Sequence, residues 1–121
     1  MPVSRQEKEY VNYVVDLMQS IGPVTARAMF GGHGIFLDGL MFGLVADSVL
    51  YLKVGRDNKD DYVRRDLEPF TYSKNGKPMR MSYYQAPEET LEDSDEMNIW
   101  ANRAYAAALQ AAAGKRKAGK S

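Results

Sequence analysis

Two apolar runs on either side of Asp38-Gly39 are the feature that most limits the fold of this chain. The runs read GIFL before the pair and LMFGLVA after it. An Asp-Gly pair between such runs is a strong hairpin signal, because a type I′ turn needs positive φ at both central residues. The sequence therefore predicts an antiparallel hairpin with a two-residue loop, in which Ile35 pairs with Phe42.

A weaker turn signal, Asp47-Ser48, predicts a further strand after the hairpin. It would pair Ala46 with Val49, Leu44 with Tyr51 and Phe42 with Lys53. Because strand side chains alternate between faces, this register predicts two apolar faces. One carries Ile35, Leu37, Leu40, Phe42, Leu44, Ala46, Val49, Tyr51 and Lys53, and the other carries Phe36, Met41, Gly43, Val45, Leu50, Leu52 and Val54. A meander with one face in water alternates apolar and polar residues, so both faces should need cover from helices, from other strands or from a second copy of the chain.

A glycine-rich segment, Gly31-Gly32-His33-Gly34, leads into this meander from a predicted strand at 27–30. Glycine reaches positive φ without a steric penalty, which indicates a sharp bend or a bulge. A phosphate-binding loop is the alternative. It is disfavoured because no Gly-Lys-Ser/Thr follows and because the next element is a strand instead of a helix N-terminus.

Three amphipathic helices are predicted outside the meander. The first covers residues 5–20, with Ser4 and Glu7 at the spacing of a capping box and Gly22-Pro23 as its stop. The second is a short helix of about ten residues that begins with the acidic run after Arg56. The last begins near Ser94, carries Trp100 as its anchor against the sheet, and ends in the alanine-rich stretch 106–113.

A second strong hairpin signal, Asn75-Gly76, predicts two more strands that extend the sheet, with Pro78 near a strand start. The predicted fold is therefore an α+β domain. It has an antiparallel β-meander sheet of about five to six strands, an N-terminal helix, a short middle helix and a C-terminal alanine-rich helix. Residues 1–113 are expected to form one domain, and residues 114–121 a flexible basic tail.

The composition argues against most catalytic chemistry. The chain has no cysteine, and His33 is its only histidine. Thiolate zinc sites and cysteine nucleophiles are thus excluded, and no histidine-based triad or multi-histidine metal site can be assembled. We expect no enzyme activity, no cofactor and no metal. In a glycine-rich bend, His33 is more typical of a turn residue than of a catalyst. The N-terminus has no apolar signal-peptide core, and no apolar run approaches the length that spans a bilayer. The sequence therefore predicts a cytoplasmic protein.

Basic side chains within or beside strands are the candidate ligand contacts. Lys53 either extends its ammonium group past the sheet edge or binds a small anion, together with Arg27 and His33. Arg80 is a further candidate for ligand or partner binding, and for Arg27 and Arg80 the alternative is a salt-bridge partner or an edge charge. Sixteen basic and sixteen acidic residues cancel, so no global field attracts nucleic acid. The tail residues Lys115, Arg116 and Lys117 could still contact phosphates. Tyrosines near Lys74 and Lys77 form a weak signal for single-stranded bases.

In combination, the motifs resemble those of the N-terminal domain of the TfoX/Sxy proteins. The resemblance covers roughly residues 10 to 112. It rests on Met29-Phe30-Gly31-Gly32, Leu50-Tyr51-Leu52-Lys53-Val54, Phe70-Thr71-Tyr72 and Met81-Ser82-Tyr83-Tyr84, with Pro87 shortly after and a late helix that carries Trp100.

This resemblance implies an α+β fold and a non-enzymatic regulatory role in bacterial competence or transcription, exerted through a protein partner such as a transcription regulator. The full-length regulators of the family carry a C-terminal helical domain that this chain lacks, so a DNA contact made by that domain does not carry over. The family supplies no catalytic residue to transfer. The apolar meander adds the expectation of a homodimer.

Overall fold

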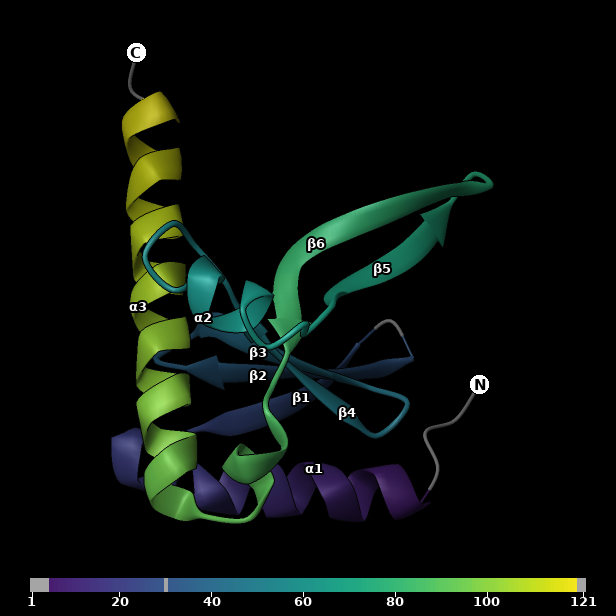
Figure 1. Cartoon of the computed structure of the whole chain (residues 1–121), viewed down its shortest axis with the longest axis vertical. Coiled ribbons are helices and arrows are strands. Elements are labelled where there is room, and N and C mark those ends of the chain that lie inside the picture. Colours follow the sequence, from purple (N-terminus) through teal and green to yellow (C-terminus); the bar gives the residue numbers. More distant parts are fainter. Residues whose placement is uncertain (1–4, 30, 120–121) are drawn as a thin grey trace.

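The computed structural model describes residues 5–29 and 31–119, and their side chains as far as residue 114. The elements in chain order are α1 (Arg5–Leu17), the 3₁₀ turn η1 (Gln19–Ile21), β1 (Thr25–Met29), β2 (Gly32–Leu37), β3 (Leu40–Ala46), β4 (Val49–Lys53), α2 (Lys59–Val63), β5 (Pro69–Lys74), β6 (Lys77–Gln85), the 3₁₀ turn η2 (Glu88–Leu91) and α3 (Ser94–Gly119). Figure 1 shows their arrangement.

The strands form a six-stranded sheet in the order β1-β2-β3-β4-β6-β5. All neighbouring strands are antiparallel. Two exposed edge strands, β1 and β5, close the two ends of this order. The predicted α+β class, with a meander sheet, an N-terminal helix, a short middle helix and a C-terminal helix, is confirmed.

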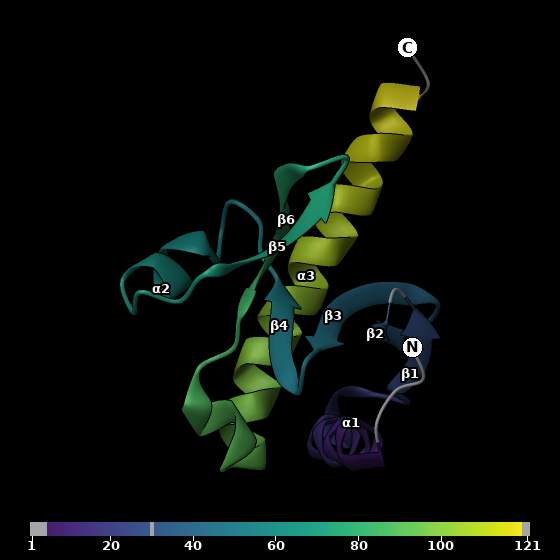
Figure 2. The same cartoon turned by 90° about the vertical axis from the view of Figure 1, so that its right-hand side faces the viewer.

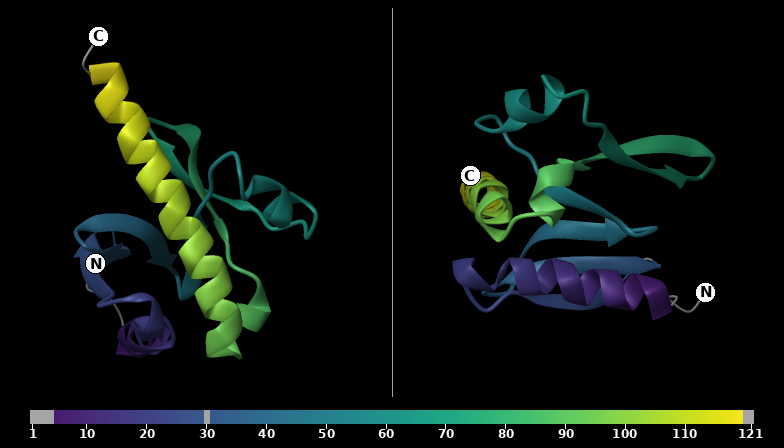
Figure 3. Two further views of the ribbon diagram at one scale, coloured as in Figure 1. Left: turned by 90° about the vertical axis from the view of Figure 1, so that its left-hand side faces the viewer. Right: turned by 60° about the horizontal axis from the view of Figure 1, so that its bottom comes forward.

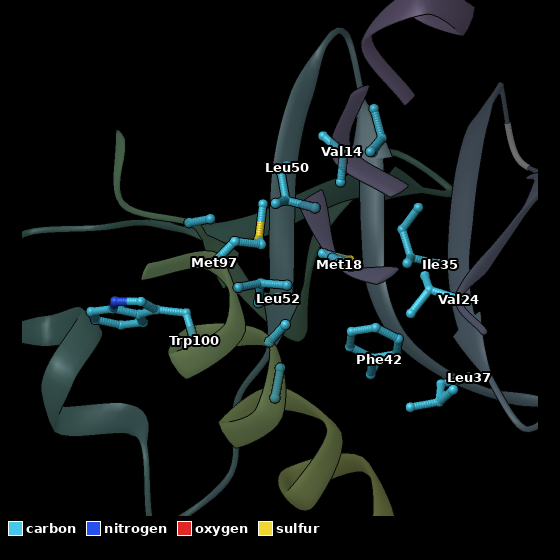
Figure 4. Close-up of a cluster of buried hydrophobic side chains, with 14 of the residues drawn as sticks. Val14, Met18, Val24, Ile35, Leu37, Phe42, Leu50, Leu52, Met97 and Trp100 are labelled. Carbon is cyan, nitrogen blue, oxygen red and sulfur yellow. The ribbon is translucent and has the colours of Figure 1, made fainter. Parts of the chain in front are cut away.

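The hydrophobic core lies between one face of the sheet and the helices, and we call this side the helix face. Figure 3 shows α3 crossing the sheet in its left panel and α1 lying along the strands in its right panel. Figure 4 shows the side chains that meet there. The cluster includes Val11, Val14 and Met18 of α1, Met97, Ala101 and Ala104 of α3, and Ile35, Leu37, Phe42, Val45, Leu50 and Leu52 of the sheet.

Both strong hairpin signals are confirmed by the backbone. Asp38 and Gly39 have φ of 52° and 76°, and Asn75 and Gly76 have φ of 53° and 78°. The weaker signal at Asp47-Ser48 also gives a two-residue turn, with φ of 51° and 57°. These values match the type I′ turn, whose twist suits a two-residue hairpin. Turn chemistry in the sequence thus placed these three reversals.

Ser48 holds positive φ without being glycine, which predicts a stabilising substitution. An L-residue in the left-handed region is strained by about 1–2 kcal/mol, and glycine recovers part of this after its larger entropy loss on folding. We expect Ser48→Gly to raise the free energy of unfolding by about 0.5–1 kcal/mol in urea titrations. The reverse change, Gly39→Ser, should lower it by a similar amount, and a destabilising Ser48→Gly would contradict the turn geometry.

The predicted register between the first two strands is wrong beyond the turn. Leu37 does pair with Leu40, but Ile35 pairs with Gly43 instead of Phe42, because the register shifts between Ile35 and Phe36. Such a bulge places two residues of one strand opposite one of the other. Phe42 therefore lies fully buried in the core next to Ile35, and every residue of β3 from Gly43 onward changes face relative to the prediction.

This one-residue shift separates the helix face from a second, open face. The pairings of Ala46 with Val49 and of Leu44 with Tyr51 are confirmed, but these residues lie on the face opposite to Phe42. Neither α1 nor α3 has a sheet partner on the open face in the core cluster. The helices gather on one face, whereas strands β5 and β6 lie beside part of the other, where Leu44 is 4% exposed. Residues that share the open face include Phe36, Met41, Leu44, Ala46, Val49, Tyr51 and Lys53.

The β5–β6 hairpin projects from the rest of the molecule as an arm. It rises at the upper right of Figure 1 and comes toward the viewer in Figure 2. Residues 71–80 are exposed throughout. Pro78 lies second in β6, near the predicted strand start. The arm bends over the open face, and this curvature creates the site described next.

Several local predictions need correction. The expected sharp bend is present at Gly31, which has φ of 76° and lies in the turn between β1 and β2. Gly32 and Gly34 belong to strand β2, however, so His33 is a strand residue and not a turn residue. The first α-helix ends at Leu17, with a 3₁₀ turn following it, and α2 is only five residues long. Ser4 of the expected capping box and Phe30 of the expected strand lie outside the described residues.

Trp100 is buried in the core cluster, as predicted, and it also packs against α2. Its ring meets the ring of Tyr62 in α2 edge to face at a centroid distance of 5.0 Å, and the Arg65 guanidinium lies 5.0 Å from its centroid. In Figure 4 the indole points away from the sheet. Trp100 thus joins α3 to α2, and it belongs to the same core cluster as Met97 and Ala101 of α3.

Candidate functional site

An apolar hollow of about 510 Å³ lies on the open face, under the β5–β6 arm. We call it the methionine groove. Its walls come from both ends of the sheet, since β1, β2 and β3 line one side and β5 and β6 line the other. The lining residues are Met29, Gly32, Met41, Leu44, Ala46, Phe70, Tyr72 and Met81. No charged residue is among them. Hollows of this size and composition are typical of ligand and peptide sites.

Glycines in β2, which have no side chain, give the groove its depth. A Cβ on Gly34 would lie 2.6 Å from the Met29 sulfur, 2.8 Å from a ring carbon of Phe36 and 3.3 Å from the Met41 sulfur. Glycine thus lets these side chains fold down over the strand. Methionine is unbranched and polarisable, so it adapts to differently shaped partners better than branched side chains do. The floor of the groove is therefore apolar and deformable.

Aromatic residues form the wall on the arm side. Tyr51 meets Phe70 edge to face at a centroid distance of 5.1 Å, and Phe70 stacks on Tyr72 at 6.5 Å. The Tyr83 hydroxyl reaches toward the Met41 carbonyl oxygen at 3.4 Å, a long and weak hydrogen bond. Tyr83 is 7% exposed. These contacts hold the base of the arm against β3 and β4.

Burial raises the pKa of Tyr83 to about 12, from an ordinary value of 10.0. The folded chain therefore keeps the phenol proton at pH values where the unfolded chain has lost it. The contribution of this group is intact below pH 10 and is lost as the pH rises toward about 12. We expect the wild type to lose about 1–2 kcal/mol more stability than Tyr83→Phe over this range. Urea titrations at pH 9 and near pH 11.5 measure the difference; equal losses would mean that Tyr83 is solvated.

The charges around the groove are unevenly distributed. At the β4 end, burial raises the pKa of Tyr51, and the negative charges of Asp47 and Glu68 raise it further. Both acids are exposed. At the arm tip, Lys74 pairs with Lys77 across the hairpin, and both are exposed. The rim thus has an acidic end near Tyr51 and a basic end at the tip of the arm.

The four predicted ligand contacts do not converge on one site. Arg27 lies on the open face of β1, with its guanidinium carbon 4.8 Å from the centroid of Phe36. His33 lies on the opposite face of the sheet, since the neighbouring pairs Arg27 with Gly34 and Ala28 with His33 alternate. Arg80 is exposed on the arm, paired with Thr71 on the face away from Tyr72. The predicted anion site therefore has no common cavity.

His33 belongs to a buried polar contact with α1. Its Nδ1 lies 3.7 Å from a carboxylate oxygen of Glu7, and the two residues are 7% and 6% exposed. The other Glu7 oxygen accepts a hydrogen bond from the Ser48 backbone N–H at 3.1 Å. Glu7 thus connects α1 to β2 and to the β3–β4 turn. This is a structural role, and nothing about it resembles a catalytic site open to substrate.

Lys53 reaches a shallow hollow at the sheet edge. Its Nζ donates to the Ser82 hydroxyl at 2.6 Å and lies 5.2 Å from the centroid of the Tyr83 ring. The hollow, of about 270 Å³, is also lined by Arg56 and Gln110. The ammonium of Lys53 thus ends beside the Ser82 hydroxyl and the Tyr83 ring, and its contact with an anion stays a prediction.

The basic segment near the C-terminus lies within α3, whose backbone is helical as far as Gly119. The expected tail of residues 114–121 therefore begins inside a helix. The side chains of Lys115, Arg116 and Lys117 lie outside the described part, so their contact with phosphates stays a prediction. In the described part of the chain, no group of three acidic or histidine side chains is placed to hold a metal ion, and no helix there is long and apolar enough to cross a membrane.

Sequence reasoning missed the methionine groove. The signal that could have found it is the presence of Met29, Met41 and Met81 in three predicted strands. Their common face depends on the bulge at Phe42 and on the curvature of the arm, and neither is readable from side-chain alternation.

Comparison with known proteins agrees with the resemblance seen in the motifs. Residues 16–108 match the model of the TfoX N-terminal domain. The chain belongs to this family. The match contains all six strands and most of α3, and so includes the whole methionine groove. The membership and the observed sheet together confirm the resemblance to the TfoX/Sxy proteins.

Two characterised relatives are similar to this TfoX-type chain. Protein Sxy of Escherichia coli (strain K12) is 26% identical over 73 residues, which cover 60% of this chain and 35% of that protein. DNA transformation protein TfoX1 of Aliivibrio fischeri (strain ATCC 700601 / ES114) is 29% identical over 86 residues, 71% of this chain and 39% of that protein. The matched region thus spans less than half the length of either relative.

Proposed function

We propose that this TfoX-type domain is a non-enzymatic regulator of competence or transcription that acts by binding another protein through the methionine groove. The name of one relative, DNA transformation protein TfoX1, supports the regulatory process. The groove supports the mode of action, since it is an apolar surface bounded by charged residues. Such surfaces on folded domains commonly mark sites of protein interaction.

The groove is the observation that carries this proposal. Tyr72 in its wall is 42% exposed and Met79 beside it is 41% exposed. Aromatic residues and methionine are enriched at the cores of protein interfaces, where they supply contact area at low entropic cost. Its lining has no charged group to activate a nucleophile, whereas the single histidine is buried on the other face. A binding role therefore suits this surface better than a catalytic one.

The test is a complementation experiment in a strain that lacks the gene. Wild type, Met41→Asp and Met81→Asp are expressed at equal levels, and transcripts of the competence genes are measured. A carboxylate in the groove should reduce the regulatory response by at least about tenfold, because a buried unpaired charge costs several kcal/mol on binding.

Thr71→Asp is the matched control, since it adds the same charge to the exposed outer face of the arm. It should respond like the wild type. Circular dichroism and the thermal midpoint establish that each variant is folded. A full response from folded Met41→Asp and Met81→Asp would refute the groove as the functional surface.

A second candidate is an anion site at the hollow of Lys53, favoured by the donors gathered there. Lys53 Nζ, the Ser82 hydroxyl, Arg56 and Gln110 line one small depression. Inorganic phosphate and common nucleotides should raise the thermal midpoint of the wild type and leave that of Lys53→Ala unchanged. Flat curves for the wild type with all of these anions would remove this candidate.

A further inference from the structure

We propose that the methionine groove is filled by the β5–β6 arm of a second copy of this chain, so that two copies clasp each other through their arms. The inference rests on the proposed function, because it names the protein that occupies the same groove. It makes the regulatory unit a homodimer whose interface is the open face of the sheet.

The arm has the shape and the side chains that such an occupant needs. It projects from the rest of the domain in Figure 1. Strand alternation gives it two different faces. Tyr72 and Met79 are a cross-strand pair on the face turned toward the groove, whereas Thr71 and Arg80 are a pair on the outer face. The inner face is thus apolar and more than two fifths exposed at both residues.

The charges of the arm and of the groove rim are complementary. Residues 69–85 contain Lys74, Lys77 and Arg80 and no acidic residue. The β4 end of the groove carries the exposed acids Asp47 and Glu68. Two copies placed with their inner faces together and their arms antiparallel would bring the lysines of each tip to the acids of the other. The remaining rim charges, Arg27 and Lys53, lie against rings of their own chain.

A two-fold arrangement satisfies both sites at once. In an isologous interface each copy contributes the same surface patch, so one arm fills each groove and neither apolar surface stays exposed. The arm also contains the edge strand β5, whose free backbone groups favour association with another chain.

Other occupants fit fewer of these features. An acidic peptide would pair with the lysines of the arm tip but would meet the like charges of Asp47 and Glu68. A nucleic acid would also suit the lysines, but it would leave the apolar groove exposed and would be repelled at the acidic end. A second copy matches the apolar surface and both ends of the rim.

Sedimentation equilibrium of the full chain tests the clasp. From about 1 to about 200 µM the wild type should shift from monomer to dimer. Tyr72→Asp and Met79→Asp should each raise the dissociation constant by at least about tenfold, because they bury a charge at the interface. Thr71→Asp, on the outer face of the same hairpin, should change it by less than about twofold. A wild type that stays monomeric throughout, or a dimer that tolerates Tyr72→Asp, overturns the proposal.

Cysteine cross-linking gives an independent readout, since the natural chain has no cysteine. Met79→Cys on one chain and Met41→Cys on another should form a mixed disulfide on mild oxidation of the mixture. Thr71→Cys mixed with Met41→Cys should form far less. Equal yields from the two mixtures would show that the arm does not enter the groove.

The two proposals can fail separately. A monomeric wild type together with a lost response in Met41→Asp refutes the clasp and retains the regulatory groove, which then takes a different protein. A dimer that Tyr72→Asp disrupts, with an unchanged transcript response, retains the clasp and refutes its regulatory role.

Discussion

Trp100→Ala should lower the free energy of unfolding by about 3–5 kcal/mol, the usual cost of removing a buried large aromatic side chain. Trp100 of α3 is 5% exposed, and its ring packs against Tyr62 of α2. The truncation leaves a cavity and also removes the stacking partner of the Arg65 guanidinium. Because a domain of this size is stable by about 5–15 kcal/mol in total, the variant should be partly unfolded at 37 °C. Urea titration at 25 °C measures the change.

Ile99→Ala is the matched control for this prediction. Ile99 is the neighbouring residue in α3 and is 47% exposed, so its truncation removes little buried surface. We expect a change below about 0.5 kcal/mol. A small effect of Trp100→Ala would mean that α2 is held by its other contacts, such as the ion pair between Arg65 and Glu89 at 2.5 Å.

Gly32→Ala should destabilise the fold by about 3 kcal/mol, at the upper end of the usual cost of overpacking. A Cβ at this position would lie 2.3 Å from the backbone carbonyl oxygen of Val45. The backbone of a central strand cannot move aside without breaking its ladder with β2 or β4. The expected result is a lower urea midpoint with an unchanged dependence on denaturant concentration.

Gly34→Ala gives the comparison that makes this prediction specific. Its Cβ would meet the ends of flexible side chains, Met29 and Phe36, which can rotate away into the groove. We expect a cost of about 1 kcal/mol there. If Gly34→Ala were as costly as Gly32→Ala, the methionine groove would be rigid, which would weaken its role as an adaptable binding surface.

The local chemistry of the turns could be predicted, because it depends on only two residues at a time. Asp38-Gly39 and Asn75-Gly76 occupy positive φ as their types require, and the helix start at Ser94 follows from an acidic first turn. Apolar periodicity likewise placed α1 and α3. These features fixed the element types and, with them, the α+β class.

Which face of the sheet each side chain occupies could not be predicted, because it depends on one bulge. No residue type marks the shift between Ile35 and Phe36. Phe42 follows the helix face because a large ring gains more from burial beneath α3, where it meets Tyr105 at 5.7 Å, than from regular pairing. A slip of one residue transfers every later side chain to the other face.

The candidate site could not be predicted from the sequence for the same reason. Arg27, His33, Lys53 and Arg80 looked like one basic group along the chain, but alternation and the long arm distribute them over two faces and an edge. Met29, Met41 and Met81 looked like ordinary core residues, yet they line one groove. A site on a sheet surface is set by long-range pairing and curvature, which no local pattern encodes.

The sequence by itself determined the strands, the three tight turns, the amphipathic helices and the family, since each follows from neighbouring residues or from a motif in fixed order. Only the tertiary structure decided which face the helices cover and where the open apolar surface lies. The physical reason is that burial is a collective choice. The chain places the larger apolar area under α1 and α3, and the side chains left on the other face become the surface available to a partner.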